Sequence, residues 1–387
     1  MHPEMETLRC SIVRGGTSKG IFIMKNALPD DPAQRDAVIL AIFGSPDIRQ
    51  IDGLGGADVL TSKLAIISPS TRPDADVDYT FGQVSFEKSF IDYKGNCGNI
   101  SSAVGGFAID EGLVTPQEPV TKVRIHLTNS HHILVAEVPV KGGQAAVEGD
   151  FAIDGCPDTG ARITLDWAGT QGAITGKMLP TGRVIDEIRL ADEVYPISIV
   201  DVANPVVFIR AESLGLTGLE TPAQIESDRA LMNRIEEIRG RAAQMIGLVD
   251  EPSAAATASP YIPFFAIISS PKDHQTFTGQ NIGQGEVDIV SRLLFMLRMH
   301  KAYPITGTVC TGAAARIAGT VVWEAMNAEA RDRVNLRIGH PSGVIPIEAE
   351  AEAGEQGTVR LTRAAVYRTA RKIMDGQVYV RKSVWNR

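Results

Sequence analysis

Two stretches of this sequence share an unusual order of residues, and they constrain the fold more than any other feature. They are GNCGNISSAVGGFAI, residues 95–109, and GTVCTGAAARIAGTVV, residues 307–322. Each has a turn-rich approach, a cysteine, a glycine within two residues, and then a run of small residues with helical spacing. Cys97 and Cys310 are 310 − 97 = 213 residues apart, so each half of the chain carries one copy. The pattern favours a duplicated domain with a cysteine at a helix start in each copy, the alternative being chance.

The length of the chain also favours two domains. With 387 residues, the chain exceeds the size at which a single hydrophobic core keeps growing. We expect an N-terminal domain over residues 1–184 and a C-terminal domain over residues 185–387. The last ~20 residues are free to pack back on the N-terminal domain, because chain termini often lie close together.

Short runs rich in Val and Ile dominate the first half of the sequence and predict strands, and the second half again mixes strands with helices. The clearest helix follows Cys97, where Ile100, Val104 and Phe107 recur at helical spacing before Gly112. Further helices are expected over residues 32–43, over residues 221–247 as one long helix, and after Cys310. The predicted class is therefore α+β.

The net charge of −8 provides no basic field for nucleic acid or for an anionic membrane surface. No stretch of about 20 uninterrupted apolar residues is present, so we expect no membrane span. The first residues lack a basic segment followed by an apolar one, and four scattered cysteines do not form a disulfide framework. These features predict a cytoplasmic protein.

Five glycine-rich stretches can bring the backbone close to a ligand: residues 14–20, 53–63, 95–99, 306–312 and 339–343. None matches a phosphate loop or a dinucleotide fingerprint. Helix starts and hydroxyl donors instead suit a small anion, and we expect a carboxylate. The candidate binding residues are Arg14, Thr17, Ser18, Lys19, Ser62, Asn96, Gly98, Asn99, Cys310, Thr311, Gly312 and Ser342.

Two residue types could carry protons. Cys97, between Asn96 and Gly98, would lie at a helix start, where backbone N–H groups favour the thiolate. Cys310 has the same interpretation, although the residues around it suit plain packing equally well. Lys63 directly precedes an apolar strand, and burial can make a lysine a useful base near neutral pH. The alternative for each is structural: a buried thiol, or a lysine that reaches solvent from a strand end.

Two other kinds of site are not favoured. His126, His131 and His132 lie close in sequence, but no carboxylate partners are evident, so we expect no metal. A serine hydrolase is not indicated either, because the sequence has no GxSxG motif.

The motifs RGGTSKG, GSPDIRQIDGLGGADVLTSK, DVDYTFGQV, GNCGN and IGHPSGVI together resemble the PrpF family. This family includes 2-methylaconitate cis-trans isomerase, methylitaconate delta-isomerase and the 4-oxalomesaconate tautomerases. The resemblance spans nearly the whole chain and implies a diaminopimelate-epimerase-like fold. In that fold, two pseudo-symmetric domains each wrap a curved, mostly antiparallel sheet around a central helix.

The resemblance also implies an activity. The family moves a carbon–carbon double bond of a small unsaturated di- or tricarboxylate by taking a proton and returning it, without a cofactor. The catalytic pair proposed for the family corresponds here to Lys63 and Cys97. The only binding partner that the resemblance implies is the polycarboxylate substrate. Two alternatives stay open: a racemase or epimerase that uses Cys97 and Cys310, and a non-catalytic carboxylate-binding protein. A homodimer is the default expectation for the assembly.

Overall fold

The structure, a computed structural model, describes residues 2–153, 155–354 and 359–386. The chain divides into two compact units. Unit 1 contains residues 1–165 together with residues 368–387, and unit 2 contains residues 166–367. The domain boundary is expected after residue 184, whereas the first segment of unit 1 ends at residue 165. The C-terminal segment, residues 368–387, groups with unit 1.

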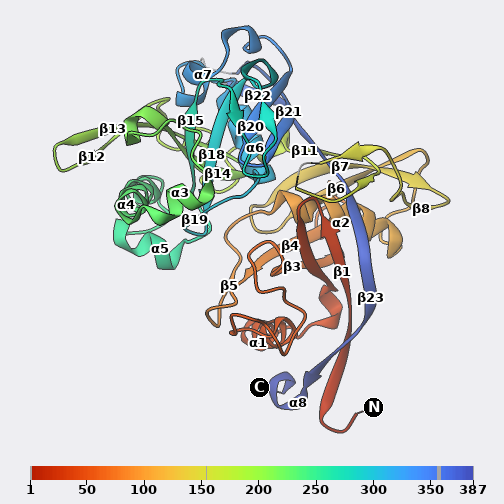
Figure 1. Cartoon of the computed structure of the whole chain (residues 1–387). Helices are drawn as coiled ribbons and strands as arrows, with labels where there is room; N and C mark the ends of the chain where they lie inside the picture. The colour runs from red at the N-terminus through yellow and green to blue at the C-terminus, as the bar shows by residue number, and fades with distance from the viewer. Residues whose placement is uncertain (1, 154, 355–358, 387) are drawn as a thin grey trace. The chain divides into compact units, whose positions relative to one another are not determined.

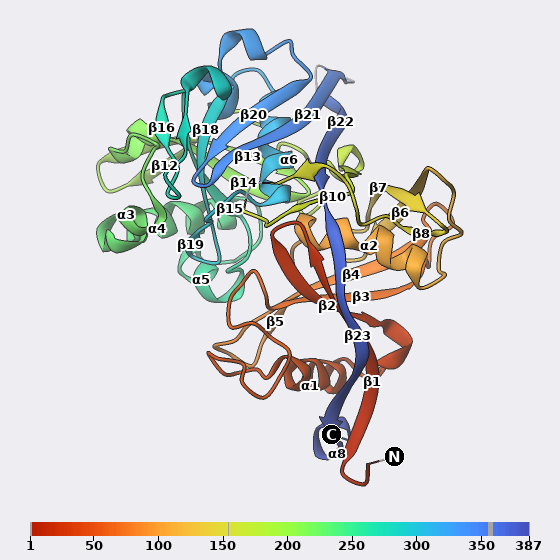
Figure 2. The ribbon, with the colours of Figure 1, turned by 45° about the vertical axis from the view of Figure 1, so that its right-hand side comes forward.

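Unit 1 is a sheet wrapped around one buried helix, α2 (Gly98–Asp110). This helix contacts the strands β1, β2, β3, β6, β7, β8 and β23. Strand β23, near the end of the chain, pairs with β1 and runs beside it in Figure 2. Most strand pairs are antiparallel, whereas β2–β3 and β4–β6 are parallel. The strands of this unit are β1 Met5–Gly15, β2 Ser18–Met24, β3 Lys63–Pro69, β4 Val77–Val84, β5 Ile91–Asp92, β6 Val120–Leu127, β7 His132–Lys141, β8 Gln144–Ala145, β9 Phe151–Ala152, β10 Thr159–Gly160, β11 Ile163–Asp166 and β23 Ala370–Arg381.

Helix α1 (Pro32–Phe43) covers the other face of β2 and β3, where Ile39 and Phe43 join a core with Ile21 and Leu64. Its predicted bounds are confirmed. Asp31 caps it by accepting the Gln34 N–H at 2.9 Å, and Gly44 ends it in the left-handed conformation, with φ 73°. A short helix, α8 (Lys382–Trp385), ends the described chain.

Unit 2 repeats this plan around α6 (Ile305–Ala314), which lies among the strands of the unit in Figure 1, and all residues of α6 are buried. Parallel pairs again occur twice, between β14 and β15 and between β18 and β20. The strands are β12 Asp186–Leu190, β13 Glu193–Val202, β14 Asn204–Arg210, β15 Phe264–Ser269, β16 His274–Gln275, β17 Asn281–Ile282, β18 Ile289–Phe295, β19 Arg298–Met299, β20 Asn335–His340, β21 Gly343–Ala353 and β22 Val359–Arg368. The other helices are α3 Pro222–Ser227, α4 Arg229–Met245, α5 Ala255–Ala258 and α7 Val321–Ala325.

The order of pairings confirms the expected pseudo-symmetry. Strands β1, β2, β3, β4, β6 and β7 of unit 1 match β13, β14, β15, β18, β20 and β21 of unit 2. One ion pair is repeated as well. Asp76, just before β4, accepts the Arg124 main-chain N–H at 2.7 Å, and Asp288, just before β18, accepts the Arg337 N–H at 2.9 Å. In each pair the arginine side chain also binds the same carboxylate.

Two predicted helices need correction. The single long helix expected over residues 221–247 is two helices, because Asp228 has φ −85° and ψ 94° and its side chain caps α4 through the Leu231 N–H. The helix predicted to start at Cys310 begins instead at Ile305 and ends at Ala314. Pro304 precedes its first residue, and alanine and glycine give too weak a periodic signal to locate its ends.

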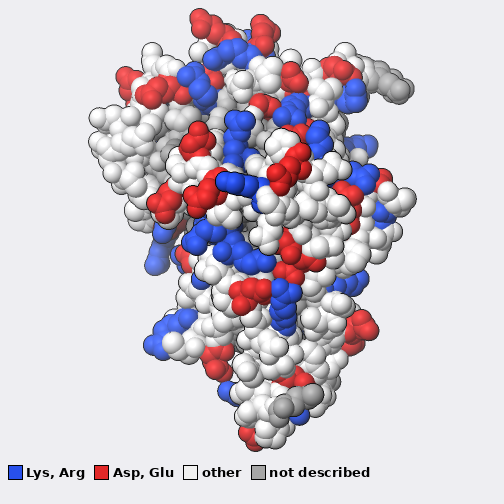
Figure 3. All heavy atoms as spheres, turned by 90° about the vertical axis from the view of Figure 1, so that its right-hand side faces the viewer, with Lys and Arg blue, Asp and Glu red and all other residues white. Residues whose placement is uncertain are grey.

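None of the described helices is both long and apolar enough to span a membrane. On the face drawn in Figure 3, Lys and Arg side chains lie interspersed with Asp and Glu side chains.

Candidate functional site

Cys97 lies at the start of α2, as predicted. It is the residue before the first helical turn, with φ −118°, and it is 6% exposed. Its carbonyl accepts hydrogen bonds from the Ser101 N–H and hydroxyl, each at 2.9 Å. The first N–H groups of a helix have no acceptor within the helix, so Gly98 and Asn99 present donors beside the thiol.

The side chain of Asn99 connects the helix start to the turn between β1 and β2. Its Nδ2 donates to Thr17 Oγ1 at 3.0 Å and to Ser18 Oγ at 3.4 Å, and its Oδ1 accepts from Arg368 Nε at 3.2 Å. Gly16 is required here, because it has φ 53° and a Cβ would lie 2.2 Å from Asn99 Oδ1. The structure therefore brings together three residues predicted from distant motifs.

Arg14 and Lys19 support this turn. Arg14 Nη1 donates to the Gly16 carbonyl at 3.1 Å and to the carbonyl and hydroxyl of Thr369 at 3.0 Å each. The main-chain N–H of Lys19 donates to Leu60 O at 2.9 Å, and its Cα pairs with that of Arg14. These contacts of Arg14 hold the hairpin in place.

Lys63 is the first residue of β3 and is 2% exposed. Its Nζ donates to Gln83 Oε1 at 2.9 Å and lies 5.5 Å from the centroid of the Phe81 ring. Its neighbour Ser62 is fully buried, and the Ser62 hydroxyl donates to Gln50 Oε1 at 2.8 Å. The lysine is therefore a core residue, and the structural alternative, a lysine that reaches solvent from a strand end, is wrong.

Gly20 separates Lys63 from the start of α2. A Cβ at Gly20 would lie 3.0 Å from Lys63 O and 2.9 Å from Ile100 Cδ1, and Ile100 is three residues after Cys97. The two predicted proton carriers thus occupy neighbouring elements at the same end of the unit 1 sheet.

Tyr79 and Asn96 are fully buried near the thiol. Burial raises the pKa of Tyr79 well above its ordinary value, and negative charge on Cys97 raises it further. Asn96 Nδ2 donates to Ser130 Oγ at 3.2 Å, which anchors the segment that leads into α2. Cys97 therefore lies among buried side chains, and a hydrogen bond anchors the segment that leads to it.

Cys310 has a different environment. It lies in the middle of α6, is fully buried, and its thiol donates to Val200 O at 3.1 Å. Burial raises the pKa of Cys310 well above its ordinary value. The prediction that both cysteines lie at helix starts is therefore wrong for this one.

The other residues predicted in unit 2 also make structural contacts. The Thr311 hydroxyl donates to Gly307 O at 2.8 Å, and a Cβ at Gly312 would lie 2.7 Å from Ile347 Cδ1. Ser342, in the turn between β20 and β21, donates its hydroxyl to Lys301 O and its N–H to His340 Nδ1.

The pseudo-symmetry identifies the true counterparts of the unit 1 residues. Ser18 begins β2 and bonds to Asn99, the second residue of α2; Asn204 begins β14 and its Nδ2 donates to Thr306 Oγ1, on the second residue of α6, at 2.9 Å. By the same alignment, Cys97 corresponds to Pro304. The β2–β3 register places Lys63 opposite Gly20, and the β14–β15 register places Phe264 opposite Val206. Unit 2 therefore has neither proton carrier at the matching positions.

Sequence reasoning missed Gln83, Tyr79 and Arg368. Gln83 is a buried polar residue near the end of β4, and a polar residue in a buried strand was a usable signal. The position of Arg368 beside Asn99 depends on the return of the C-terminal segment to unit 1, which no local pattern encodes.

The histidines do not form a metal site in the part of the chain that the structure describes. His126 Nδ1 lies 2.8 Å from Asp78 Oδ1, and no group of three or more His, Cys, Asp or Glu side chains there is placed to hold a metal ion.

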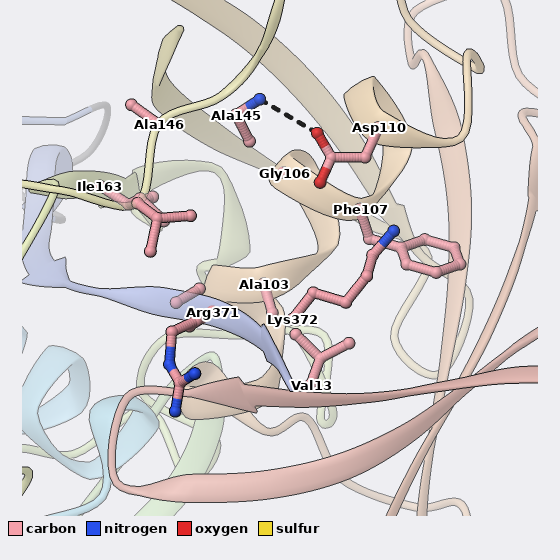
Figure 4. A pocket seen from close by; sticks show the side chains of 12 residues that line it. Val13, Ala103, Gly106, Phe107, Asp110, Ala145, Ala146, Ile163, Arg371 and Lys372 are labelled. Carbon is pink, nitrogen blue, oxygen red and sulfur yellow. Dashed lines mark hydrogen bonds between the residues drawn. The ribbon is translucent and has the colours of Figure 1, made fainter. Parts of the chain in front are cut away.

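A cavity of about 90 Å³ lies along α2, away from its start (Figure 4). Figure 4 shows Lys372 extending over Phe107, and Asp110 accepting the Ala145 N–H. The volume of the cavity is well below the roughly 300 Å³ at which ligand pockets typically begin. This cavity is therefore small for a ligand, and neither Lys63 nor Cys97 lines it.

Residues 5–381 match the family model described as "PrpF protein". The chain belongs to the PrpF family. It is 51% identical to the 3-methylitaconate isomerase of Eubacterium barkeri, over 97% of both chains. It is 37% identical to the 2-methyl-aconitate isomerase of Shewanella oneidensis (99% of both chains) and 38% identical to the 4-oxalomesaconate tautomerase of Pseudomonas putida (97% of both chains).

The fold of this chain is similar to that of solved structures. A crystal structure of methylitaconate-delta-isomerase superposes with a TM-score of 0.84 at 50% identity, covering 99% of this chain and 97% of that one. A hydroxyproline epimerase from Agrobacterium vitis has a TM-score of 0.58 at 12% identity, covering 97% and 93%. The second likeness shows the fold alone and confirms the epimerase-like architecture.

Proposed function

We propose that this protein is an isomerase of small unsaturated di- or tricarboxylates that moves a carbon–carbon double bond by transferring a proton. The observation that carries the proposal is the presence of a buried lysine, Lys63, and of a buried cysteine at the start of α2, Cys97, on neighbouring elements of one unit in a PrpF-family chain. Relatives named as isomerases and a tautomerase of such acids support this reaction class.

The proposed mechanism uses only side chains and backbone groups of unit 1. One of Lys63 and Cys97 takes a proton from a carbon next to the carboxylate-conjugated double bond, and the other returns a proton to a different carbon of the allylic system. Deprotonation leaves negative charge on the substrate carboxylate. The N–H groups of Gly98 and Asn99 would stabilise this charge, and such donors are worth about 3–4 kcal/mol each in comparable sites.

Two different proton carriers suit transfer between different carbons. Inversion at one carbon instead needs two carriers on opposite faces of that carbon. The two-cysteine racemase is disfavoured, because the thiol of Cys310 is buried in mid-helix and donates to Val200 O. A non-catalytic carboxylate-binding protein would give a different experimental result: it would bind the acid without exchanging its protons.

The test is a substrate panel. Purified protein is mixed with 2-methylaconitate, methylitaconate and 4-oxalomesaconate in D2O, and proton NMR and ultraviolet absorbance follow each acid. We expect isomerisation with deuterium incorporation for at least one acid, and loss of both in the Lys63→Ala variant. Absence of exchange with all three acids, or unchanged exchange in the variant, contradicts the proposal.

A further inference from the structure

The amide of Gln83 makes buried contacts that fix its orientation. Gln83 is 2% exposed, and its Nε2 donates to the carbonyls of Val59 at 3.2 Å and Ser62 at 3.1 Å. Because carbonyl oxygens only accept, the NH2 group must face them, and Oε1 must face Lys63 Nζ at 2.9 Å. The usual ambiguity between the two amide ends is therefore removed.

Unit 2 has an apolar pair at the matching place. Asp76 precedes β4 and Asp288 precedes β18, and counting seven residues onward from each aligns Gln83 with Phe295. Phe295 packs edge-on against Phe264, the counterpart of Lys63, with ring centroids 5.9 Å apart. The scaffold therefore accepts two aromatic rings where unit 1 has a lysine and a glutamine. Burying polar groups costs free energy unless they are hydrogen-bonded, so packing does not explain the polar pair.

We propose that Gln83 is a positioning residue that holds Lys63 Nζ in place for proton transfer, an inference that rests on the proposed function. A lysine amine has two N–H groups and a lone pair, and an ammonium has three N–H groups. Gln83 Oε1 can accept an N–H from either form. The contact therefore survives both protonation states through which a lysine must pass in each turnover.

An amide also suits this position better than a carboxylate. A carboxylate beside Lys63 stabilises the ammonium and so opposes its action as a base. It also has no hydrogens to donate to the Val59 and Ser62 carbonyls, so both contacts would be lost, and Ser62 O would keep only the Val84 N–H at 3.0 Å. Gln83 supplies an acceptor to the lysine and donors to the backbone at once.

The experiment compares Gln83→Leu and Gln83→Glu with the wild type, using the acid that the panel identifies. Gln83→Leu is expected to lower kcat about 10²-fold while KM changes little, because the catalytic group loses its position. Gln83→Glu is expected to shift the rising limb of the kcat–pH profile upward by about 1–3 units. The titratable groups on the elements around Lys63 are Lys19 on β2, Asp78 and Tyr79 on β4, Asp92 on β5, Cys97 at the start of α2 and Asp110 at its end. The Asp92→Asn profile, recorded alongside, separates the contribution of that carboxylate.

Gln171 offers a matched control in unit 2. Its Nε2 donates to the carbonyls of Ala168 and Leu361, each at 3.1 Å, and its Oε1 accepts the Leu361 N–H at 2.8 Å. Gln171→Leu therefore removes the same kind of backbone anchor without touching a lysine. We expect it to lower thermal stability and leave kcat unchanged.

Two results overturn the inference: a kcat of Gln83→Leu close to that of the wild type, or an equal loss in Gln171→Leu. Crystal structures of the wild type and of Gln83→Leu provide a readout that needs no turnover. Lys63 Nζ is expected at hydrogen-bond distance from residue 83 in the first and displaced in the second, and an unmoved Nζ contradicts the inference. A wild type that exchanges no acid refutes the proposed function instead, and the crystallographic comparison still decides whether Gln83 holds the lysine.

Discussion

The two units have the same architecture but different residues at the starts of their central helices. Unit 1 has Cys97 before α2, and unit 2 has Pro304 before α6. Lys63 is matched by Phe264. The supporting contacts, by contrast, are kept: Asn99 bonds to Ser18, and Thr306 bonds to Asn204. The two units therefore share the scaffold of the helix start, while the two predicted proton carriers lie in unit 1.

The comparison also separates two kinds of cysteine. Cys97 lies where helix N–H groups are free and hydroxyl and amide side chains gather. Cys310 is the sixth residue of α6, so its counterpart in α2 is Ala103 rather than Cys97. Sequence similarity around a cysteine is thus a poor guide to equivalence, and hydrogen-bond patterns are a better one.

The largest expected effect comes from removing the proton carriers. Lys63→Ala and Cys97→Ala should each lower kcat by about 10²–10⁴-fold, the range for a general acid or base. Phe264→Leu, at the unit 2 position that matches Lys63, should leave kcat nearly unchanged. Initial rates on the identified acid measure both, with circular dichroism confirming that each variant is folded. An equal loss of kcat in Phe264→Leu would contradict the claim that the two units differ in function.

The repeated ion pair predicts a difference in stability. Burial of Asp288 tends to raise the pKa of its carboxyl group, but the hydrogen bonds from Arg337 hold that pKa below its ordinary value. A lowered pKa in the folded state stabilises the protein above the unfolded pKa of about 3.9, and this stabilisation is lost as pH falls. Asp288→Asn should therefore cost about 3 kcal/mol at pH 7 and less at pH 4.

Asp76→Asn is the matched variant in unit 1. The pKa of Asp76 is also lowered, with burial opposing and Arg124 favouring the shift, but its side chain is 23% exposed whereas that of Asp288 is fully buried. We expect a smaller loss in the free energy of unfolding, measured by urea denaturation at both pH values. A larger loss at Asp76 than at Asp288 contradicts this account.

Asn99 and Thr306 compare the two helix starts directly. Asn99→Ala removes the hydrogen bonds to Thr17, Ser18 and Arg368, so the donors beside Cys97 lose their support. We expect kcat/KM to fall about 10²-fold. Thr306→Val removes the unit 2 bond and should change kcat/KM far less. Similar losses would show that both helix starts take part in the reaction equally.

The smallest effect is expected at Cys310. Cys310→Ala removes a thiol that donates to Val200 O, so stability should fall by about 1 kcal/mol while kcat stays near the wild-type value. Because burial raises the pKa of this thiol, Cys310 should also resist alkylation by iodoacetamide in the folded protein at pH 8. Mass spectrometry of the labelled protein measures this, and rapid labelling of Cys310 contradicts it.

Much of unit 1 was predictable from sequence, because its signals are local. Pro32, Gly44 and the spacing after Cys97 locate α1 and α2. The break at Asp228 was not predicted, since the apolar pattern runs through it and only the side-chain cap interrupts the helix. The start of α6 was missed because alanine and glycine carry little periodicity.

The candidate site was predictable in its motifs and not in its partners. Lys63 and Cys97 follow from the TSK and GNCGN stretches. The contact between Lys63 and Gln83 depends on the register of β3 and β4, and the contact between Arg368 and Asn99 depends on a segment 269 residues away. Such pairings are set by the tertiary fold and leave no trace in a single stretch of sequence.

The most direct test of the central claim is the rate of deuterium incorporation from D2O into the substrate, compared between Cys97→Ala and Cys310→Ala. If the proton carriers belong to unit 1, Cys97→Ala loses incorporation at the position its thiol serves, and Cys310→Ala keeps the wild-type rate. Loss of incorporation in Cys310→Ala with a correctly folded protein, or its retention in Cys97→Ala, would contradict the account.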